Sequence, residues 1–244
     1  MNMKSLKYTT AALNEMMDAL KDLVFPEYAE LSKEAATEII RRSLSILAGN
    51  EIAEQFIEGI PEISRLMGTD VAAIKANDPA ATDLQEVIFC YPAVKAILFY
   101  RTAHLLWNMK VRILPRMLTE FAHSATGIDI HPGAQIGAYF AIDHGTGTVI
   151  GETTIIGEHV TLYQGVTLGA KNFCYDKDGC PINIPRHPIL EDWVTVYSNA
   201  SWLGRITIGE SSVIGGNVWL THSVPAGSRI LQGHHLDQLS KEDC

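Results

Sequence analysis

An apolar residue stands at every sixth position through most of the second half of this 244-residue chain. A six-residue period fits neither an amphipathic helix nor a strand with one buried face. It is typical of a β-helix of hexapeptide repeats, in which the apolar side chains of each turn stack on those of the next turn. The period slips by two residues at His144-Gly-Thr-Gly and resumes after an interruption at residues 169–188. Its positions are Ile130, Ile136, Ile142, Ile150, Ile156, Leu162, Leu168, Leu190, Val196, Trp202, Ile208, Ile214 and Leu220.

The interruption at residues 169–188 is polar and is punctuated by glycine and proline. Because the apolar positions return in register after it, we expect a loop that is extruded from one turn of the β-helix. A loop that leaves a rigid scaffold is a frequent place for function.

Residues 1–127 show a helical period instead. Apolar residues spaced by three and four predict helices over residues 13–24, 32–49 and 93–109. The remaining sequence is expected to be divided at Pro61, Gly68, Pro79, Pro92 and Pro115. The prediction is an α+β protein, with an all-helical N-terminal domain at residues 1–127, a β-helix domain at 128–222 and a C-terminal tail at 223–244.

Composition excludes several classes of function. Hydrophobic residues make up 47% of the chain and charged residues 19%, which is a globular balance, and the formal net charge of −9 disfavours a nucleic acid partner. No run approaches the ~20 apolar residues of a membrane helix, and Glu15, Asp18 and Asp22 interrupt any signal-peptide core. Four cysteines are too few for a disulfide scaffold. We therefore expect a cytoplasmic protein with no membrane partner.

Asp143 and His144 are the strongest candidates for catalysis, because they occupy the slip in the period beside two glycines. One turn is about three hexapeptides, so Asp129 is expected roughly one turn beneath them. A carboxylate in that position would orient the imidazole and stabilise its protonated form, as a general base requires. The spacing alone leaves open a histidine that only stabilises the turn.

The other histidines raise an alternative, a zinc enzyme of the γ-carbonic anhydrase kind. His104 and His123 lie on predicted helices, and His159 and His222 fall at corners of the repeat. No spacing typical of zinc ligands is evident among them, so no metal is expected.

Several segments closely resemble serine acetyltransferases. They are Asp129-Ile-His-Pro-Gly-Ala-Gln-Ile-Gly, Asp143-His-Gly-Thr-Gly-Thr-Val-Ile-Gly-Glu-Thr, Gln164-Gly-Val-Thr-Leu-Gly and Arg186-His-Pro, with Asp78-Pro-Ala and Tyr100-Arg-Thr-Ala-His-Leu-Leu-Trp upstream. The resemblance covers roughly residues 69–222. It implies a left-handed β-helix that trimerises, with active sites between subunits. It also implies acetyl transfer from acetyl-CoA to the hydroxyl of L-serine, on the route to cysteine.

The resemblance also implies a role for each matching residue. His144 corresponds to the general base and Asp129 to its partner, while Asp143 and Asp78 match acidic groups that receive the serine ammonium. Arg186 matches the cation for the serine carboxylate, and His187 lies in the same site. The acetyl-CoA groove is expected along Gly169, Ala170, Ser198 and Gly216. Acetyl-CoA is then a co-substrate, no cofactor is tightly bound, and L-cysteine is a candidate feedback inhibitor.

The sequence departs from the family pattern in three places. The loop before Arg186 is longer than in many members, and Ser198 and Gly216 stand where alanines are common. The chain ends in Cys244 instead of isoleucine, which disfavours a tight complex with O-acetylserine sulfhydrylase. A homotrimer and a dimer of trimers both remain open. The rival interpretations are a hexapeptide acetyltransferase for a sugar or antibiotic, and a β-helix module without catalysis.

Overall fold

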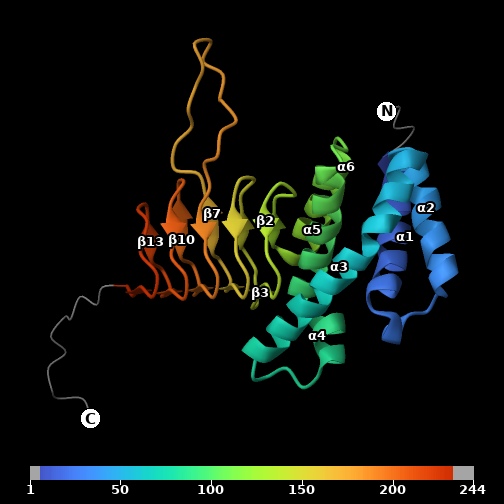
Figure 1. The fold of residues 1–244 in the computed structure, drawn as a ribbon, viewed down its shortest axis with the longest axis horizontal. Coiled ribbons are helices and arrows are strands. Elements are labelled where there is room, and N and C mark those ends of the chain that lie inside the picture. The colour runs from blue at the N-terminus through green and yellow to red at the C-terminus, as the bar shows by residue number, and fades with distance from the viewer. Residues whose placement is uncertain (1–5, 233–244) are drawn as a thin grey trace, which may run out of the picture.

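The helices gather at one end of the molecule, and the stacked turns of a β-helix extend from them (Figure 1). The computed structural model describes residues 6–232, with side chains from residue 10. The helical elements are α1 (Leu6–Val24), η1 (Pro26–Tyr28), α2 (Lys33–Leu47), α3 (Asn50–Asn77), α4 (Leu84–Cys90), α5 (Pro92–Asn108) and α6 (Leu114–Thr126). None of the helices in this part of the chain combines the length and apolarity needed to cross a membrane.

Short strands follow α6 and form three parallel sheets, one for each side of the β-helix. Sheet 1 contains β1 (Asp129–Ile130), β4 (Val149–Ile150), β7 (Thr167–Gly169), β10 (Ser201–Leu203) and β13 (Trp219–Leu220). Sheet 2 contains β2 (Gln135–Ile136), β5 (Ile155–Ile156), β8 (Ile189–Leu190) and β11 (Thr207–Ile208). Sheet 3 contains β3 (Ala141–Ile142), β6 (Thr161–Leu162), β9 (Thr195–Val196), β12 (Val213–Ile214) and β14 (Arg229–Ile230).

The six-residue period is the cause of this stacking. In sheet 1, Ile130 pairs with Ile150, Ile150 with Leu168, and the column continues through Trp202 to Leu220. All the periodic positions except the partly buried Ile136 are buried, so they form one narrow core that no single turn could bury alone. The predicted fold class, helices followed by a left-handed β-helix of hexapeptide repeats, is confirmed.

Two local expectations differ from the structure. α3 runs without a break through Pro61 and Gly68, both of which are exposed, because its opposite face buries a continuous apolar stripe. That stripe comprises Phe56, Ile60, Ile63, Met67, Val71 and Ile74. The segment expected to be a tail contains one more strand, β14, which pairs with β12; residues 233–244 lie outside the described residues.

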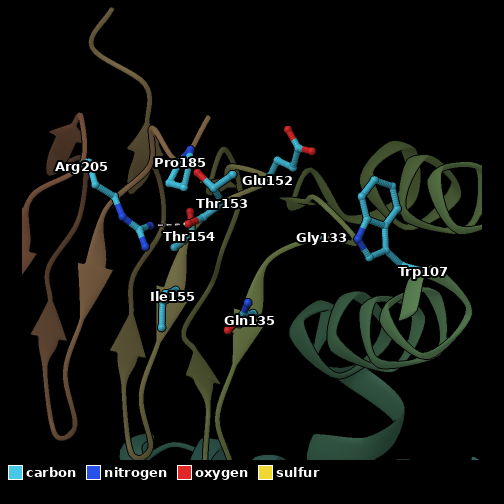
Figure 2. A pocket seen from close by; sticks show the side chains of 9 residues that line it. All are labelled: Trp107, Gly133, Gln135, Glu152, Thr153, Thr154, Ile155, Pro185 and Arg205. Atoms are coloured by element: carbon cyan, nitrogen blue, oxygen red, sulfur yellow. Dashed lines mark hydrogen bonds between the residues drawn. The ribbon is translucent and has the colours of Figure 1, made fainter. Parts of the chain in front are cut away.

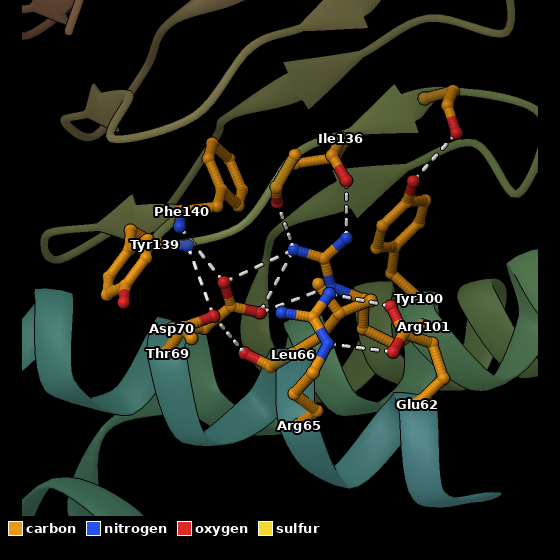
Figure 3. A network of polar contacts seen from close by, with 12 residues as sticks. Glu62, Arg65, Leu66, Thr69, Asp70, Tyr100, Arg101, Ile136, Tyr139 and Phe140 are labelled. Atoms are coloured by element: carbon orange, nitrogen blue, oxygen red, sulfur yellow. Dashed lines mark hydrogen bonds and ion pairs between the residues drawn. The ribbon is translucent and has the colours of Figure 1, made fainter. Parts of the chain in front are cut away.

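A buried ion pair between two helices, with the hydrogen bonds that it makes, joins the helices to the first turn of the β-helix (Figure 3). Arg101 on α5 and Asp70 on α3 are 3.1 Å apart, and their side chains are 3% and 1% exposed. The Arg101 guanidinium also donates to the carbonyls of Ile136 and Gly137, each at 2.5 Å, and Asp70 accepts the backbone N–H of Phe140 at 2.9 Å. Burial raises the pKa of Asp70 to about 6 although Arg101 opposes the shift. These bonds fix α3 and α5 against sheets 2 and 3.

Candidate active site

The slip in the period is a two-residue insertion that pushes His144 out of the β-helix. The turn from Asp129 to Thr148 is two residues longer than the next turn, as the pairing of Asp129 with Val149 and of Val149 with Thr167 shows. His144 has a left-handed backbone (φ 56°) and a side chain that is 71% exposed. At Gly145 the backbone turns toward the core, so a Cβ atom on this residue would lie only 2.5 Å from the Ile128 side chain. The insertion therefore presents an imidazole at the edge between sheets 3 and 1, which we call the histidine edge.

Two carboxylates stand beside this imidazole. Asp143 Oδ1 lies 3.9 Å from His144 Nδ1. Asp78, at the C-terminal end of α3, accepts hydrogen bonds from the Tyr91 hydroxyl and from the Ala80 backbone N–H, the latter at 2.8 Å. These bonds, with a contribution from His144, hold the pKa of Asp78 below its usual range. Asp78 and Asp143 line the same shallow pocket of the histidine edge.

Tyrosines and small residues continue the histidine edge along the next turns. Tyr163 follows β6 as Asp143 follows β3, and its ring stacks on Tyr197 with the centroids 4.9 Å apart. Burial first, and then the charge of Asp143, raise the pKa of Tyr163. Farther along, a Cβ atom on Gly216 would lie 3.2 Å from the Ser198 carbonyl oxygen, so these two predicted groove residues are stacked on successive turns.

Asp129 does not lie beneath Asp143 as the spacing predicted. Asp129 and Asp143 are separated by less than one full turn, so Asp129 begins the same turn, in sheet 1, and pairs with Val149 of the next turn. Its Oδ1 is 3.7 Å from the Arg116 guanidinium of α6. Within residues 10–232 the Asp129 carboxylate makes no hydrogen bond to His144.

A second cluster surrounds Arg186 and His187 at the base of the extruded loop. The loop projects from the β-helix as a long hairpin between β7 and β8 (Figure 1). Arg186 pairs with Glu152 Oε2 at 2.7 Å, and Asn183 donates to the other oxygen of Glu152 at 3.2 Å. Burial raises the pKa of Glu152, but these hydrogen bonds lower it by more, so the pKa lies below its usual range.

A hydrogen bond from Thr153 fixes the tautomer of His187. His187 Nδ1 accepts the Thr153 backbone N–H at 3.1 Å and lies 2.9 Å from its hydroxyl, so Nδ1 carries no proton. Burial is the main cause that lowers the pKa of His187 to about 4, and Arg186 adds to the shift. A Cβ atom on Gly151 would lie 2.0 Å from the His187 ring, so only glycine leaves room for it. The segment that begins at Asp143 and resembles the family includes Gly151, Glu152 and Thr153, but the sequence analysis predicts no role for these three residues.

The two clusters lie on different edges of the β-helix. Arg186 and His187 lie just before β8, while Gly169 ends β7 and Ala170 follows it. All four residues therefore border the edge between sheets 1 and 2, which we call the arginine edge. Asp78, Asp143, His144, Ser198 and Gly216 belong to the histidine edge. Apart from Asp129, which lies in sheet 1 itself, a single chain therefore brings the predicted residues together in two groups that border opposite margins of sheet 1.

A separate pocket opens on sheet 2, next to the arginine edge (Figure 2). Its walls include Trp107, Gln135 and Glu152, and Arg205, whose guanidinium donates to the Thr153 carbonyl at 2.6 Å. None of the residues predicted for the site lines this pocket.

In the described part of the chain, one group of side chains has the geometry of metal ligands. Glu120, His123 and Asp129 place their ligand atoms within 4.8 Å of one another. Arg116 pairs with both carboxylates, so a cation already occupies this place. Of the other histidines, His104 forms a hydrogen bond from Nδ1 to the Pro132 carbonyl at 2.8 Å.

Comparison with known proteins identifies the family. The chain is 48% identical over 229 residues to the plasmid serine acetyltransferase of Synechococcus elongatus, covering 93% of this chain and 70% of that protein. It is 46% identical over 165 residues to the serine acetyltransferase of Mycobacterium tuberculosis, covering 68% of this chain and 69% of that protein. No protein-family model matches the chain. The chain belongs to the serine acetyltransferase family.

Solved structures agree with this membership. Serine acetyltransferase isoform 3 of Entamoeba histolytica, in complex with cysteine, superposes with a TM-score of 0.78 at 32% identity over 93% of this chain and 84% of that one. The Brucella abortus serine acetyltransferase in complex with coenzyme A gives 0.69 at 25% identity, covering 96% and 82%. Membership makes this chain an acyltransferase, so the resemblance found in its motifs is confirmed.

Proposed function

We propose that this acyltransferase moves the acetyl group of acetyl-CoA to the hydroxyl of L-serine, with His144 as the general base. The observation that carries the proposal is the outward imidazole of His144 beside Asp143 and Asp78, because that arrangement joins a proton acceptor to two anions. The anions suit the ammonium of an amino acid. A sugar acceptor carries no cation for them, and a β-helix without catalysis would leave all three side chains unused.

The reaction needs one base and no covalent enzyme intermediate. Imidazole exchanges protons near neutral pH, so His144 takes the proton of the serine hydroxyl as its oxygen attacks the thioester carbon. The C–S bond then breaks, and the imidazolium returns the proton to the departing sulfur of CoA. Asp129 is proposed to orient His144 and stabilise its protonated form, which requires its carboxylate to exchange Arg116 for the imidazole.

Charge complementarity selects the acceptor. Asp78 and Asp143 would bind the ammonium of serine, and the Arg186 guanidinium would bind its carboxylate in a bidentate manner. His187 would line the same site as a neutral donor through Nε2. Cysteine presents the same ammonium and carboxylate, so it should compete with serine for this site.

A cyclic trimer would complete the site. The histidine edge and the arginine edge are the two margins of sheet 1. If sheet 1 of each copy faces a threefold axis, the histidine edge of one copy meets the arginine edge of the next, and the ring closes. Trp219 of β13, whose side chain points out of sheet 1, is 66% exposed in the single chain, as expected of a surface that a copy covers.

The same arrangement gives acetyl-CoA a groove between subunits. Ser198 and Gly216 would line one wall, on the turns beyond His144, and Gly169 and Ala170 of the neighbouring copy would line the other. A pantetheine arm lying along these turns would carry its thioester to His144.

The test is acetyl-CoA-dependent release of free CoA with the purified protein. We expect turnover with L-serine, and little with D-serine, a galactoside or no acceptor. His144→Ala should lower kcat by ~10²–10⁴ and leave acetyl-CoA binding intact. Turnover with the galactoside but not with serine would establish the sugar enzyme, and no turnover with any acceptor would favour the module without catalysis.

The expectation about a complex with O-acetylserine sulfhydrylase rests on Cys244, which lies outside the described residues.

A further inference from the structure

Tyr91 contacts the histidine edge from the helical part of the chain, and no motif in the sequence singled it out. It stands between α4 and α5, where it ends the first helix and caps the second. Its backbone N–H bonds to the Val87 carbonyl at 3.2 Å, and Pro92 fixes the start of the next helix. The ring is half-buried against the helical core. The tyrosine hydroxyl is therefore carried by a rigid junction.

That hydroxyl donates a hydrogen bond to Oδ2 of Asp78. The other oxygen, Oδ1, accepts the Ala80 backbone N–H at 2.8 Å. With a donor on each oxygen, the plane of the carboxylate is fixed. The hydrogen bond to Asp78 raises the pKa of Tyr91 to about 12, so the hydroxyl keeps its proton at neutral pH.

The backbone that carries Asp78 is tied to the β-helix at the neighbouring residue. Asn77, the last residue of α3, donates from Nδ2 to the Thr161 hydroxyl of β6 at 2.9 Å. Lys75 donates to the Ala81 carbonyl at 2.7 Å and closes the loop after the helix. The position of Asp78 is thus set by the backbone, and the direction of its carboxylate is set by Tyr91.

We propose that Tyr91 is a positioning residue for acceptor binding, which aims the Asp78 carboxylate at the ammonium of the substrate. The proposal rests on the proposed function, in which Asp78 receives that ammonium. Tyr91 touches Asp78 and acts on the substrate only through it. A carboxylate held in advance by two donors loses less freedom when the ammonium binds.

The test compares Tyr91→Phe with Tyr139→Phe in the full chain. Phenylalanine keeps the ring and removes only the hydroxyl. Tyr139 is a matched control because it lies on the third edge of the β-helix, stacked on His159 with centroids 4.2 Å apart, and its hydroxyl makes no hydrogen bond within the described residues. We expect Tyr91→Phe to raise the KM for serine ~10-fold, as loss of a bond to a charged group does. The KM for acetyl-CoA should stay within about twofold, and Tyr139→Phe should change neither constant.

Two further measurements separate positioning from general damage. The inhibition constant of 3-hydroxypropanoate, which has the hydroxyl and the carboxylate of serine but no ammonium, should be the same in wild type and Tyr91→Phe. In an Asp78→Asn background, Tyr91→Phe should add less than about a twofold loss of serine affinity by calorimetry, because the two residues act as one unit.

The outcomes are distinguishable. Equal weakening of serine and 3-hydroxypropanoate, or additive losses in the double variant, would overturn the positioning role. Wild-type kinetics in Tyr91→Phe would overturn it too. A wild-type protein that releases no CoA with serine would instead refute the proposed function itself.

Discussion

Gly151 shows how one missing side chain makes room for a residue of the site. A methyl group there would lie 2.0 and 2.2 Å from two atoms of the His187 ring, which is 7% exposed and has no space to retreat. We expect Gly151→Ala to cost ~1–3 kcal/mol of stability and to displace His187. Thermal unfolding together with the KM for serine would measure both effects.

The control for that substitution is Gly68→Ala on α3. Nothing lies within 4 Å of a Cβ atom at Gly68, and the residue is in a helix interior. Alanine there should raise stability by ~0.5–1 kcal/mol. Equal melting temperatures for the two variants would contradict the packing described around His187.

His187 should also make stability depend on pH. Its pKa is about 4 in the folded protein, lowered from 6.5 mainly by burial, so the unfolded chain binds the proton first as the pH falls. The folded state therefore loses stability between about pH 6.5 and 4, by ~2 kcal/mol at pH 5. His187→Asn lacks the titrating group, so its melting temperature should fall less than that of wild type between pH 7 and pH 5. Parallel losses in the two proteins would show that His187 is not the group responsible.

At the scale of elements, one buried ion pair between α3 and α5 helps to hold the helices to the β-helix. Asp70→Ala would leave the Arg101 charge buried without its partner, and such a loss costs ~3–5 kcal/mol. Glu62→Ala on the same helix breaks the exposed pair with Arg65, whose side chains are 57–59% exposed, and should cost ~0–1 kcal/mol. Figure 3 shows both pairs. Chemical denaturation of the two variants gives the comparison, and similar losses would contradict the importance of burial.

At the scale of the whole molecule, the separation of the two edges predicts complementation between subunits. In the proposed trimer each site takes His144 from one copy and Arg186 from the next. In a mixed trimer a site is intact when its histidine edge comes from an Arg186→Ala subunit and its arginine edge comes from a His144→Ala subunit. Random trimers from equal amounts of both variants should therefore have about a quarter of their sites intact. We expect about that share of wild-type activity at low serine after the variants are unfolded and refolded together. Refolding each variant alone is the control, and activity no higher than the mean of the two would show that each site lies within one chain.

The sequence by itself determined the kind of fold and named the candidate residues of the site. The β-helix follows from a local rule repeated every six residues, because each apolar residue needs only its counterpart one turn away. The motifs at Asp143-His144 and Arg186-His187 likewise stand out without any structure.

Only the tertiary structure decided how those residues are grouped. Asp129 begins the turn that contains Asp143 and His144, so it lies below Val149 in sheet 1 and not beneath these two residues. Tyr91, Asp70 and Thr153 take their roles from partners 13 to 34 residues away along the chain. Such contacts depend on how helices pack across the β-helix and on which edge each turn presents, and no short pattern in the sequence encodes them. The physical reason is that periodicity fixes what is buried, whereas packing fixes which polar groups meet.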